Sequence, residues 1–425
     1  MENKSNFGKF MLLWTGELVS SIGGGLTSFG LGVYVFAQTG SAAGMALITL
    51  LGFLPTFLFS VPAGVLADRY DRRLLMMIGD GCSALGILYI LFCMMQGDCA
   101  TWQIGVGVFV SATFQALLAP AYNATITDLL TAEEYSRASG LVNIAGSSRY
   151  LISPMIAGFL LSVSDVKLLM IIDICTFFLT FASTAVVKKG IAKKETEVKE
   201  SFLESFKVGW QAVHSRRGVF VLILVSSAIT LFMGVFQILA EPMVLAFSDA
   251  KTLGITETIC ASGMLVSSVY LGIRGIKKHF VRVLSISLAL SGVAIFGFGI
   301  WENIPLMAVF GFGFFLMLPF ANNCLDYLVR TNIPDELQGR AWGLIGFLSQ
   351  IGYVVAFGCS GLLSDFLGKT LNIGVGRGAA LVVEASGILL VLISLLLLRI
   401  KSVRETERVA TEAAAQTISC SEISA

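Results

Sequence analysis

Apolar runs of about twenty residues recur along the whole 425-residue chain, and they limit its possible folds more than any other feature. One such run forms a helix long enough to cross a bilayer core of about 30 Å. Charged residues make up only 13% of the chain, whereas soluble domains carry about 25%. Because a backbone inside lipid must satisfy its own hydrogen bonds, these runs are expected to be transmembrane helices.

The runs predict an all-α membrane protein with twelve spans. Their positions are roughly 10–38, 42–67, 74–96, 101–126, 140–163, 167–187, 219–247, 254–273, 282–300, 305–328, 341–366 and 377–399. The first run is too long for the core of a signal peptide and has no small-residue cleavage site. We therefore expect the N-terminus to be retained.

Lysine and arginine fix the expected orientation. With the N-terminus inside, the inner segments carry 24 of these residues and the outer loops carry 4, namely Lys167, Lys251, Lys369 and Arg377. Such an excess marks the cytoplasmic side of a membrane protein. We expect a multi-pass protein of the cell membrane with both termini in the cytoplasm.

The longest polar stretch, residues 188–218, divides the chain into two parts. We expect an N-terminal six-helix bundle at 1–187, a cytoplasmic central loop at 188–218, a C-terminal six-helix bundle at 219–399 and a cytoplasmic tail at 400–425. Within the loop, residues 201–213 place Phe202, Phe206 and Trp210 on one helical face. This pattern predicts an amphipathic helix on the inner membrane surface, with a solvated linker as the alternative.

The two halves also resemble each other in sequence. Residues 137–141 read RASGL and residues 340–344 read RAWGL, an offset of 203 that also carries Gly158 onto Gly361. The matching places in the two halves favour an internal duplication. Parallel repeats of this kind imply a pseudo-two-fold axis along the membrane normal and a substrate site between the halves.

A short motif lies between the second and third spans, where residues 64–73 read GVLADRYDRR. This stretch resembles the signature loop of the major facilitator superfamily, which occurs at the same place. The resemblance implies two pseudo-symmetric bundles of six helices and a gating role for Gly64, Asp68, Arg69, Arg72 and Arg73. Physically, a glycine such as Gly64 permits close helix approach, and Asp68 can pair with a base or a helix N-terminus.

A second motif lies in the fifth span. Drug exporters of the superfamily carry the pattern GxxxGPxxGG, and residues 149–158 read RYLISPMIAG. Pro154 and Gly158 match this pattern, while Ser153 and Ala157 are small replacements. Pro154 is expected to bend the helix and Gly158 to allow tight packing. The resemblance favours export over uptake.

The first half also resembles the macrolide-efflux-like branch of the drug:proton antiporters, through Phe10 to Trp14, Gly16, Gly23, residues 39–41 and residues 62–64. The sequence departs from that branch in two places. Residues 23–25 read GGG where an acid often stands beside the span-one glycine. The span-four arginine of many proton antiporters is absent from residues 104–118.

Ionisable residues inside the spans are the candidate coupling groups. Each costs about 2.5–3.5 kcal/mol to insert, so most have a partner or a function. We take Glu17, Arg149, Asp173 and Glu241 as candidates for the substrate or proton path. A carboxyl can exchange a proton whereas an arginine cannot, so Glu17 is the expected carrier and Arg149 its counter-charge. A static ion pair between these two is the alternative.

The other acids within the spans and some of the aromatic residues also have expected roles. Asp80 and Asp326 are expected to be structural partners of the basic cytoplasmic loops, and Asp173 and Glu241 to face the outer vestibule. Phe236 and Met233 belong to a group that can line an adaptable apolar pocket. The other members of that group are Phe29, Phe36 and Phe232.

Several function classes are disfavoured. The net charge of +1 gives no reason to expect a nucleic-acid partner. The eight cysteines and two histidines form no cluster with metal-ligand spacing, and no GxxxxGK[ST] loop is present. We therefore expect no cofactor, no metal, no catalytic residue and no enzyme activity.

The expected function is secondary-active efflux of small amphipathic, drug-like molecules by proton antiport and alternating access, from a monomer in the lipid bilayer. The resemblance extends this expectation to macrolides. A dedicated metabolite, siderophore or lysolipid carrier of the same fold is the alternative within transport. The sequence favours neither a membrane enzyme nor a transporter-like receptor.

Overall fold

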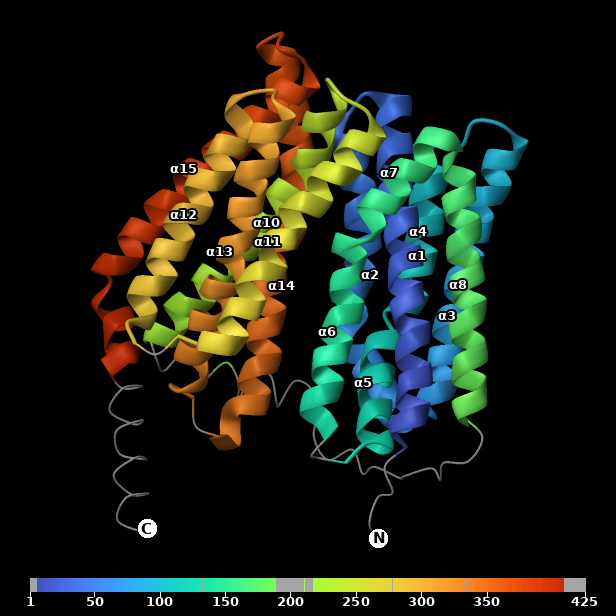
Figure 1. The fold of residues 1–425 in the computed structure, drawn as a ribbon, viewed down its shortest axis with the longest axis horizontal. Helices are drawn as coiled ribbons and strands as arrows, with labels where there is room; N and C mark the ends of the chain where they lie inside the picture. Colours follow the sequence, from blue (N-terminus) through green and yellow to red (C-terminus); the bar gives the residue numbers. More distant parts are fainter. Residues whose placement is uncertain are drawn as a thin grey trace. The chain divides into compact units, whose positions relative to one another are not determined.

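A computed structural model of the chain describes residues 6–131, 134–188, 210, 217–276, 278–333 and 335–408. At residues 61, 68, 136, 188 and 335–343 the description covers the backbone alone. The described residues form helices joined by short connections, and no strand occurs among them (Figure 1). The predicted all-α class is therefore confirmed.

The first part of the chain contains eight helices. They are α1 (Phe7–Thr39), α2 (Ala42–Arg69), α3 (Arg72–Gln96), α4 (Thr101–Gln115), α5 (Leu118–Leu129), α6 (Tyr135–Leu151), α7 (Ser153–Val163) and α8 (Val166–Lys188). The second part contains α10 (Arg217–Leu245), α11 (Ala250–Arg274), α12 (Phe280–Ile300), α13 (Ile304–Arg330), α14 (Asp335–Thr370) and α15 (Gly374–Arg399). Twelve candidate membrane spans lie in these helices, as the sequence predicts.

Two of the spans consist of two helices each. The fourth span breaks between α4 and α5, and the fifth breaks between α6 and α7. Pro120 and Pro154 follow the two breaks directly, and proline removes a backbone donor and clashes with the carbonyl four residues earlier. The bend expected at Pro154 is therefore present.

The chain forms two compact units. Unit 1 consists of residues 1–198 and 244–258, and unit 2 consists of residues 199–243 and 259–425. The first turns of α11 therefore belong to unit 1, although the rest of that helix belongs to unit 2. The predicted division at residues 187 and 219 stays a prediction, and most of the predicted amphipathic helix at 201–213 lies outside the described residues.

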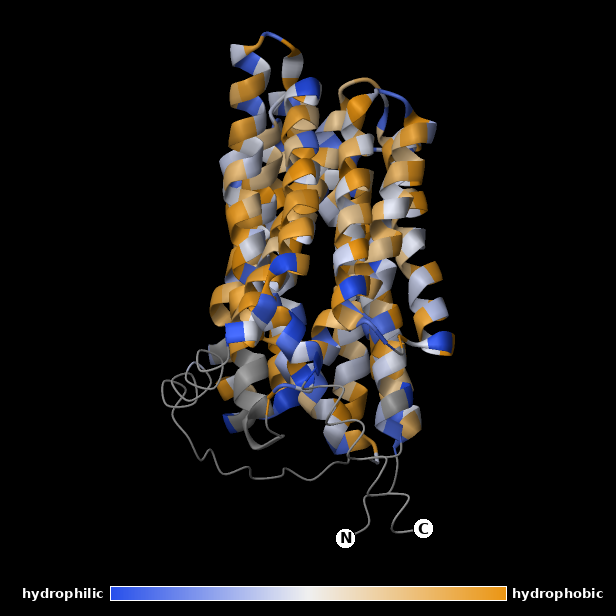
Figure 2. Cartoon of the chain, turned by 90° about the vertical axis from the view of Figure 1, so that its left-hand side faces the viewer, coloured by the Kyte–Doolittle hydropathy of each residue, from blue (hydrophilic) through white to orange (hydrophobic). Residues whose placement is uncertain are grey.

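The interior of unit 1 contains two apolar clusters and a layer of buried polar residues. One cluster contains Phe10 and Leu129 near the start of α1, and the other contains Leu31 and Ile90 further along the same bundle. The polar layer consists of buried polar residues of α1, α3 and α8, namely Thr27, Asp80, Ser83, Asp173, Thr176, Thr180, Ser183 and Thr184. Hydrophilic residues otherwise gather toward the helix ends (Figure 2). A polar layer in this position indicates function, because buried polar groups are costly in a membrane.

Candidate functional site

Three glycines of α1, spaced seven residues apart, bring this helix close to α8. A Cβ atom built on Gly16 would lie 2.8 Å from the Ser183 hydroxyl, and one on Gly30 would lie 2.9 Å from Leu169. The middle glycine, Gly23, faces Asp173 and Thr176 in the same way. Residues seven apart lie on one helical face, so the three glycines make a continuous contact surface for α8.

Asp173 lies against this surface and is almost completely buried, with 1% of its area exposed. A Cβ atom on Gly23 would be only 2.9 Å from its Oδ1 atom. The Thr176 hydroxyl donates a hydrogen bond of 3.5 Å to the Asp173 Oδ1 atom, and the carboxyl group interacts electrostatically with Arg149. Asp173 is therefore an interior residue of unit 1, whereas its place in the sequence led us to expect that it faces a vestibule.

The position of Asp173 bears on the glycine run of α1. The sequence has GGG at residues 23–25, where the macrolide-efflux-like branch often carries an acid. In the structure a carboxyl group of α8 fills the space beside Gly23. Only the absence of a side chain at residue 23 permits this approach. The chain thus places an acid beside α1 from a neighbouring helix.

Arg149 enters the same region from the other side of α1. A Cβ atom on Gly25 would lie 3.0 Å from the backbone oxygen of Arg149. The Ser153 hydroxyl donates a hydrogen bond of 3.0 Å to the Ile22 carbonyl. These contacts hold the break between α6 and α7 against α1, so that the arginine charge acts on carboxyl groups of α1 and α8.

Glu17 lies two turns before Gly25 on α1 and is half-buried. Its carboxyl group interacts electrostatically with Arg149. Glu17 forms no ion pair within 4.0 Å with another residue whose side chain the structure describes. The two predicted partners therefore interact through their charges without a contact ion pair.

Asp80 also belongs to this group. It is 2% exposed and interacts electrostatically with Glu17. The expectation that Asp80 pairs with the cytoplasmic loops is wrong, because it lies in the buried polar layer of unit 1. The Tyr122 hydroxyl interacts with Glu17 as well and has no hydrogen-bond partner among the described atoms.

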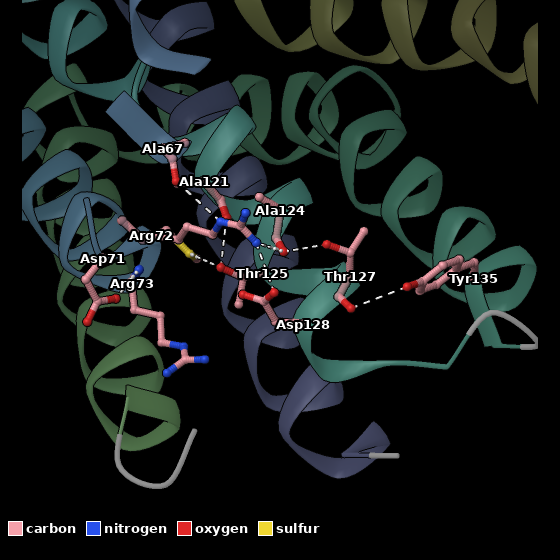
Figure 3. Close-up of polar contacts among 11 residues, drawn as sticks. Ala67, Asp71, Arg72, Arg73, Ala121, Ala124, Thr125, Thr127, Asp128 and Tyr135 are labelled. Atoms are coloured by element: carbon pink, nitrogen blue, oxygen red, sulfur yellow. Dashed lines mark hydrogen bonds and ion pairs between the residues drawn. The ribbon is translucent and has the colours of Figure 1, made fainter. Parts of the chain in front are cut away.

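The signature loop makes a defined set of contacts at one end of unit 1 (Figure 3). The Arg72 guanidinium forms an ion pair of 3.0 Å with Asp128 and donates hydrogen bonds to the carbonyls of Ala67 and Ala124. The Asp71 side chain accepts a hydrogen bond from the Arg73 backbone and caps α3. Arg72 therefore ties together the end of α2, the start of α3 and α5.

The other residues of the signature loop differ in how exposed their side chains are. Arg69 is exposed and Arg73 is 7% exposed. The Asp68 side chain lies outside the described residues, and a Cβ atom on Gly64 would meet no described atom within 4 Å. The close helix approach expected at Gly64 is not seen here, and the gating roles of these residues stay predictions.

The exporter-motif helix α7 packs against the first turns of α11 within unit 1. A Cβ atom on Gly158 would lie 2.5 Å from the Ala250 carbonyl, and one on Gly254 would overlap the Pro154 carbonyl. Ser153 and Ala157 are fully buried on the same helix. The tight packing expected at Gly158 is therefore observed, and the backbones of the two helices touch there.

Sequence reasoning missed one acid near this contact. Glu257 lies on α11, one turn after Gly254, and is half-buried. It falls within a predicted span, so the rule that selected the other ionisable residues would have found it. The candidate Glu241 lies on α10 beside Pro242 and is also half-buried.

Unit 2 has a different interior. Phe236 contacts the rings of Phe298, Phe314 and Phe315, with centroid distances of 4.7, 4.9 and 6.0 Å. Phe236, Phe298 and Phe314 are at most 4% exposed. Phe236 is therefore packed into the unit, whereas Met233 accepts a hydrogen bond of 3.1 Å from the Tyr353 hydroxyl.

Comparison with known proteins identifies the family. The model of the Major Facilitator Superfamily matches residues 13–357. Macrolide efflux protein A of Streptococcus pyogenes is 26% identical over 381 residues, which cover 87% of this chain and 92% of that protein. The multidrug efflux pump Tap of Mycolicibacterium fortuitum is 24% identical over 385 residues, covering 85% and 90%.

Solved structures show the same fold. The nucleoside transporter NupG superposes with a TM-score of 0.72 at 12% identity, covering 92% of this chain and 99% of its own. A bacterial homologue of the lysosomal transporter Spinster also has a TM-score of 0.72, at 12% identity, covering 97% and 99%. Together with the matching family model over residues 13–357, these likenesses show that the chain belongs to the major facilitator superfamily.

Proposed function

We propose that this transporter exports small amphipathic molecules from the cell in exchange for protons. The observation that carries this proposal is the polar layer of unit 1, where Glu17, Asp80 and Asp173 lie in the membrane-spanning part of the bundle with one arginine, Arg149. Carboxyl groups in such a place are costly unless they are paired or change their protonation. The two efflux relatives, at 26% and 24% identity, support export of drug-like compounds.

The proposed coupling uses the different chemistry of the acids and the base. Arg149 keeps its positive charge throughout the cycle, because a guanidinium does not release its proton in proteins. Glu17 and Asp80 interact electrostatically, so ionising one raises the cost of ionising the other. We assign the proton that is exchanged for cargo to Glu17, which also interacts electrostatically with Arg149.

Further features of the proposal follow from the sequence. We propose that the protein lies in the cell membrane with both termini in the cytoplasm, works as a monomer, uses no cofactor and catalyses no reaction. The signature-loop residues Arg72 and Asp128 hold one end of unit 1, and we assign this contact to gating. Rocking of the two units would then give alternating access.

A whole-cell efflux assay tests the proposal. We would measure retention of a macrolide, a cationic dye and a lysolipid in efflux-deficient cells that express wild type, Glu17→Gln or no transporter. The variant Glu302→Gln is a matched control, since Glu302 is exposed in the connection between α12 and α13. We expect wild type and Glu302→Gln to lower retention of at least one compound, and Glu17→Gln or a protonophore to abolish the effect.

Two outcomes would overturn parts of this proposal. No change in retention of any compound would exclude broad drug efflux and favour a dedicated metabolite, siderophore or lysolipid carrier. Efflux that survives both the protonophore and Glu17→Gln would exclude proton coupling through Glu17.

A further inference from the structure

The described part of unit 1 leaves a polar stripe of α6 uncovered. The stripe consists of Ser139, Asn143, Gly146 and Tyr150, which follow one another at spacings of four, three and four residues and therefore share one face of the helix. All four are exposed, and Tyr150 is 53% exposed. A Cβ atom built on Gly146 would meet no described atom within 4 Å. The stripe is therefore open along its length.

The opposite face of α6 holds this helix in the bundle. Ala138, Ala145 and Ser148 are at most 4% exposed, and their positions along the helix place them on the side away from the stripe. Helix α6 packs against α1, and the Ser153 hydroxyl just after α6 donates a hydrogen bond of 3.0 Å to the Ile22 carbonyl of α1. The packing of unit 1 therefore uses the buried face of α6 and not the stripe.

The stripe lies in the interior of a membrane span. Tyr150 is the middle residue of the candidate span Arg137–Val163, and Asn143 precedes it by about 10 Å along the helix axis. The Asn143 side-chain amide and the Tyr150 hydroxyl form no hydrogen bond with another described residue. Polar groups without partners are costly in hydrocarbon, so lipid is a poor cover for this face. Polar side chains at this depth instead mark the path of a substrate.

The sequence repeat provides a comparison for the tyrosine of the stripe. The offset of 203 between the fifth and eleventh spans carries Tyr150 onto Tyr353 of α14. In unit 2 the Tyr353 hydroxyl donates a hydrogen bond of 3.1 Å to the Met233 Sδ atom, and its ring centroid lies 5.5 Å from that of Phe357. Tyr150 makes neither kind of contact with another described residue. Its hydroxyl and its ring are therefore open to a ligand.

We propose that this stripe of α6 binds the cargo in unit 1 and selects amphipathic molecules that carry several neutral oxygen acceptors. The inference rests on the proposed export function and names the surface that recognises the cargo. The Asn143 amide and the Tyr150 hydroxyl donate hydrogen bonds, the Tyr150 ring supplies apolar contact, and Arg149 adds further donors beside them. The ester, ketone and hydroxyl oxygens of a macrolide fit this set, whereas a cationic dye offers few such acceptors.

The test measures equilibrium binding of a radiolabelled macrolide to the full chain, purified in detergent, without a proton gradient. Tyr150→Phe and Asn143→Leu should each raise the Kd by about 2- to 10-fold, which is the usual effect of one lost hydrogen bond. Gly146→Leu should raise it further, because the new side chain covers the stripe in a space that is empty in unit 1. Ile144→Leu is the matched control, since Ile144 is 55% exposed on another face of α6, and it should leave the Kd unchanged.

Further outcomes separate cargo recognition from coupling and from helix packing. Glu17→Gln should bind the macrolide with the wild-type Kd, so a failure of proton coupling leaves this result intact. A cationic dye should displace the macrolide only poorly. Wild type that binds no macrolide, or a dye that displaces it as well as unlabelled macrolide does, would overturn the selectivity. The same Kd for wild type and Gly146→Leu would overturn the stripe as the binding surface, even if that variant slowed the efflux of every compound.

Discussion

In unit 1, buried carboxyl groups of α3 and α8 lie near Glu17 and Arg149, whereas the described interior of unit 2 contains a cluster of packed phenylalanine rings. In unit 1, Asp80 and Asp173 are 2% and 1% exposed and lie near Glu17 and Arg149, respectively. In unit 2, Phe236, Phe298 and Phe314 pack edge to face or tilted. Unit 2 also has acids within its spans, where Asp365 is 9% exposed and Glu384 pairs with Arg377 at 3.8 Å.

This difference suggests a division of work between units that share a fold. Buried carboxyl groups can change charge, whereas phenylalanine rings supply apolar contact and rigidity. We assign proton coupling to unit 1 and mainly packing to the aromatic interior of unit 2. Changes in the two interiors should therefore have different consequences for transport and for stability.

The largest effect is expected from Glu17→Gln in unit 1. Glutamine keeps the shape of the side chain but cannot exchange a proton. We expect uphill efflux to fall to the level of cells without the transporter, while the thermal unfolding temperature changes little. Efflux and unfolding would be measured on the same variant, and near wild-type uphill efflux would remove Glu17 from the coupling mechanism.

The next effect is expected from Phe314→Ala in unit 2. Truncating a buried phenylalanine costs about 3–5 kcal/mol, through lost contacts and the cavity left behind. Phe314 is 1% exposed and packs against Phe236, so the free energy of unfolding should fall by this amount. Proton exchange per molecule of cargo should stay unchanged in protein that remains folded. A change in that ratio would contradict the division between the units.

A smaller effect is expected where α1 meets α8. Gly23→Ala would place a methyl group 2.9 Å from Asp173 and closer still to Thr176, which should cost about 1–3 kcal/mol of stability. Gly24→Ala is the matched control, since a Cβ atom there meets no described atom within 4 Å. It should be neutral or stabilising by up to about 1 kcal/mol. Equal unfolding temperatures for the two variants would show that α1 and α8 are not in close contact.

The smallest effect concerns two helix caps, one in each unit. Asp249 caps α11 through a 2.8 Å bond from the Thr252 N–H, and Asn303 caps α13 through a 3.1 Å bond from the Leu306 N–H. Replacing either by alanine should cost about 1 kcal/mol at pH 7. The backbone and side-chain hydrogen bonds of Thr252 lower the pKa of Asp249.

The pH dependence should distinguish these two caps. Because the pKa of Asp249 is lower in the folded state, its stabilisation is present above the unfolded value of about 3.9 and is lost as the pH falls through the folded pKa. The loss caused by Asp249→Ala should shrink in acid, whereas that caused by Asn303→Ala should not. The free energy of unfolding of both variants would be measured in detergent between neutral and acidic pH. The same pH dependence for the two variants would contradict the prediction.

The sequence was sufficient for the fold because span length and lysine–arginine distribution depend on local composition. The twelve spans and the bend before Pro154 are confirmed. The role of Asp80 was misjudged because its surroundings depend on how α3 is rotated toward α1 and α8. Sequence position alone gave its depth along a span but not the face on which it lies.

The site was harder to predict because its members come from several helices. Asp173 and Gly23 are 150 residues apart in the chain, and only their packing shows that one fills the space beside the other. Tyr122 was missed because a tyrosine in a span carries no sequence signal of its own. Spacing did predict the close packing of Gly158, since small residues in an exporter-like pattern indicate helix contact.

Proton exchange in proteoliposomes tests the central claim most directly. Purified wild type, Glu17→Gln and Glu302→Gln would be reconstituted with a pH-sensitive dye inside, and a compound found to be exported would be added. We predict a cargo-dependent pH change for wild type and Glu302→Gln and none for Glu17→Gln, although that variant still binds the compound. A pH change of wild-type size with Glu17→Gln would contradict the claim that the carboxyl groups of unit 1 couple transport to protons through Glu17.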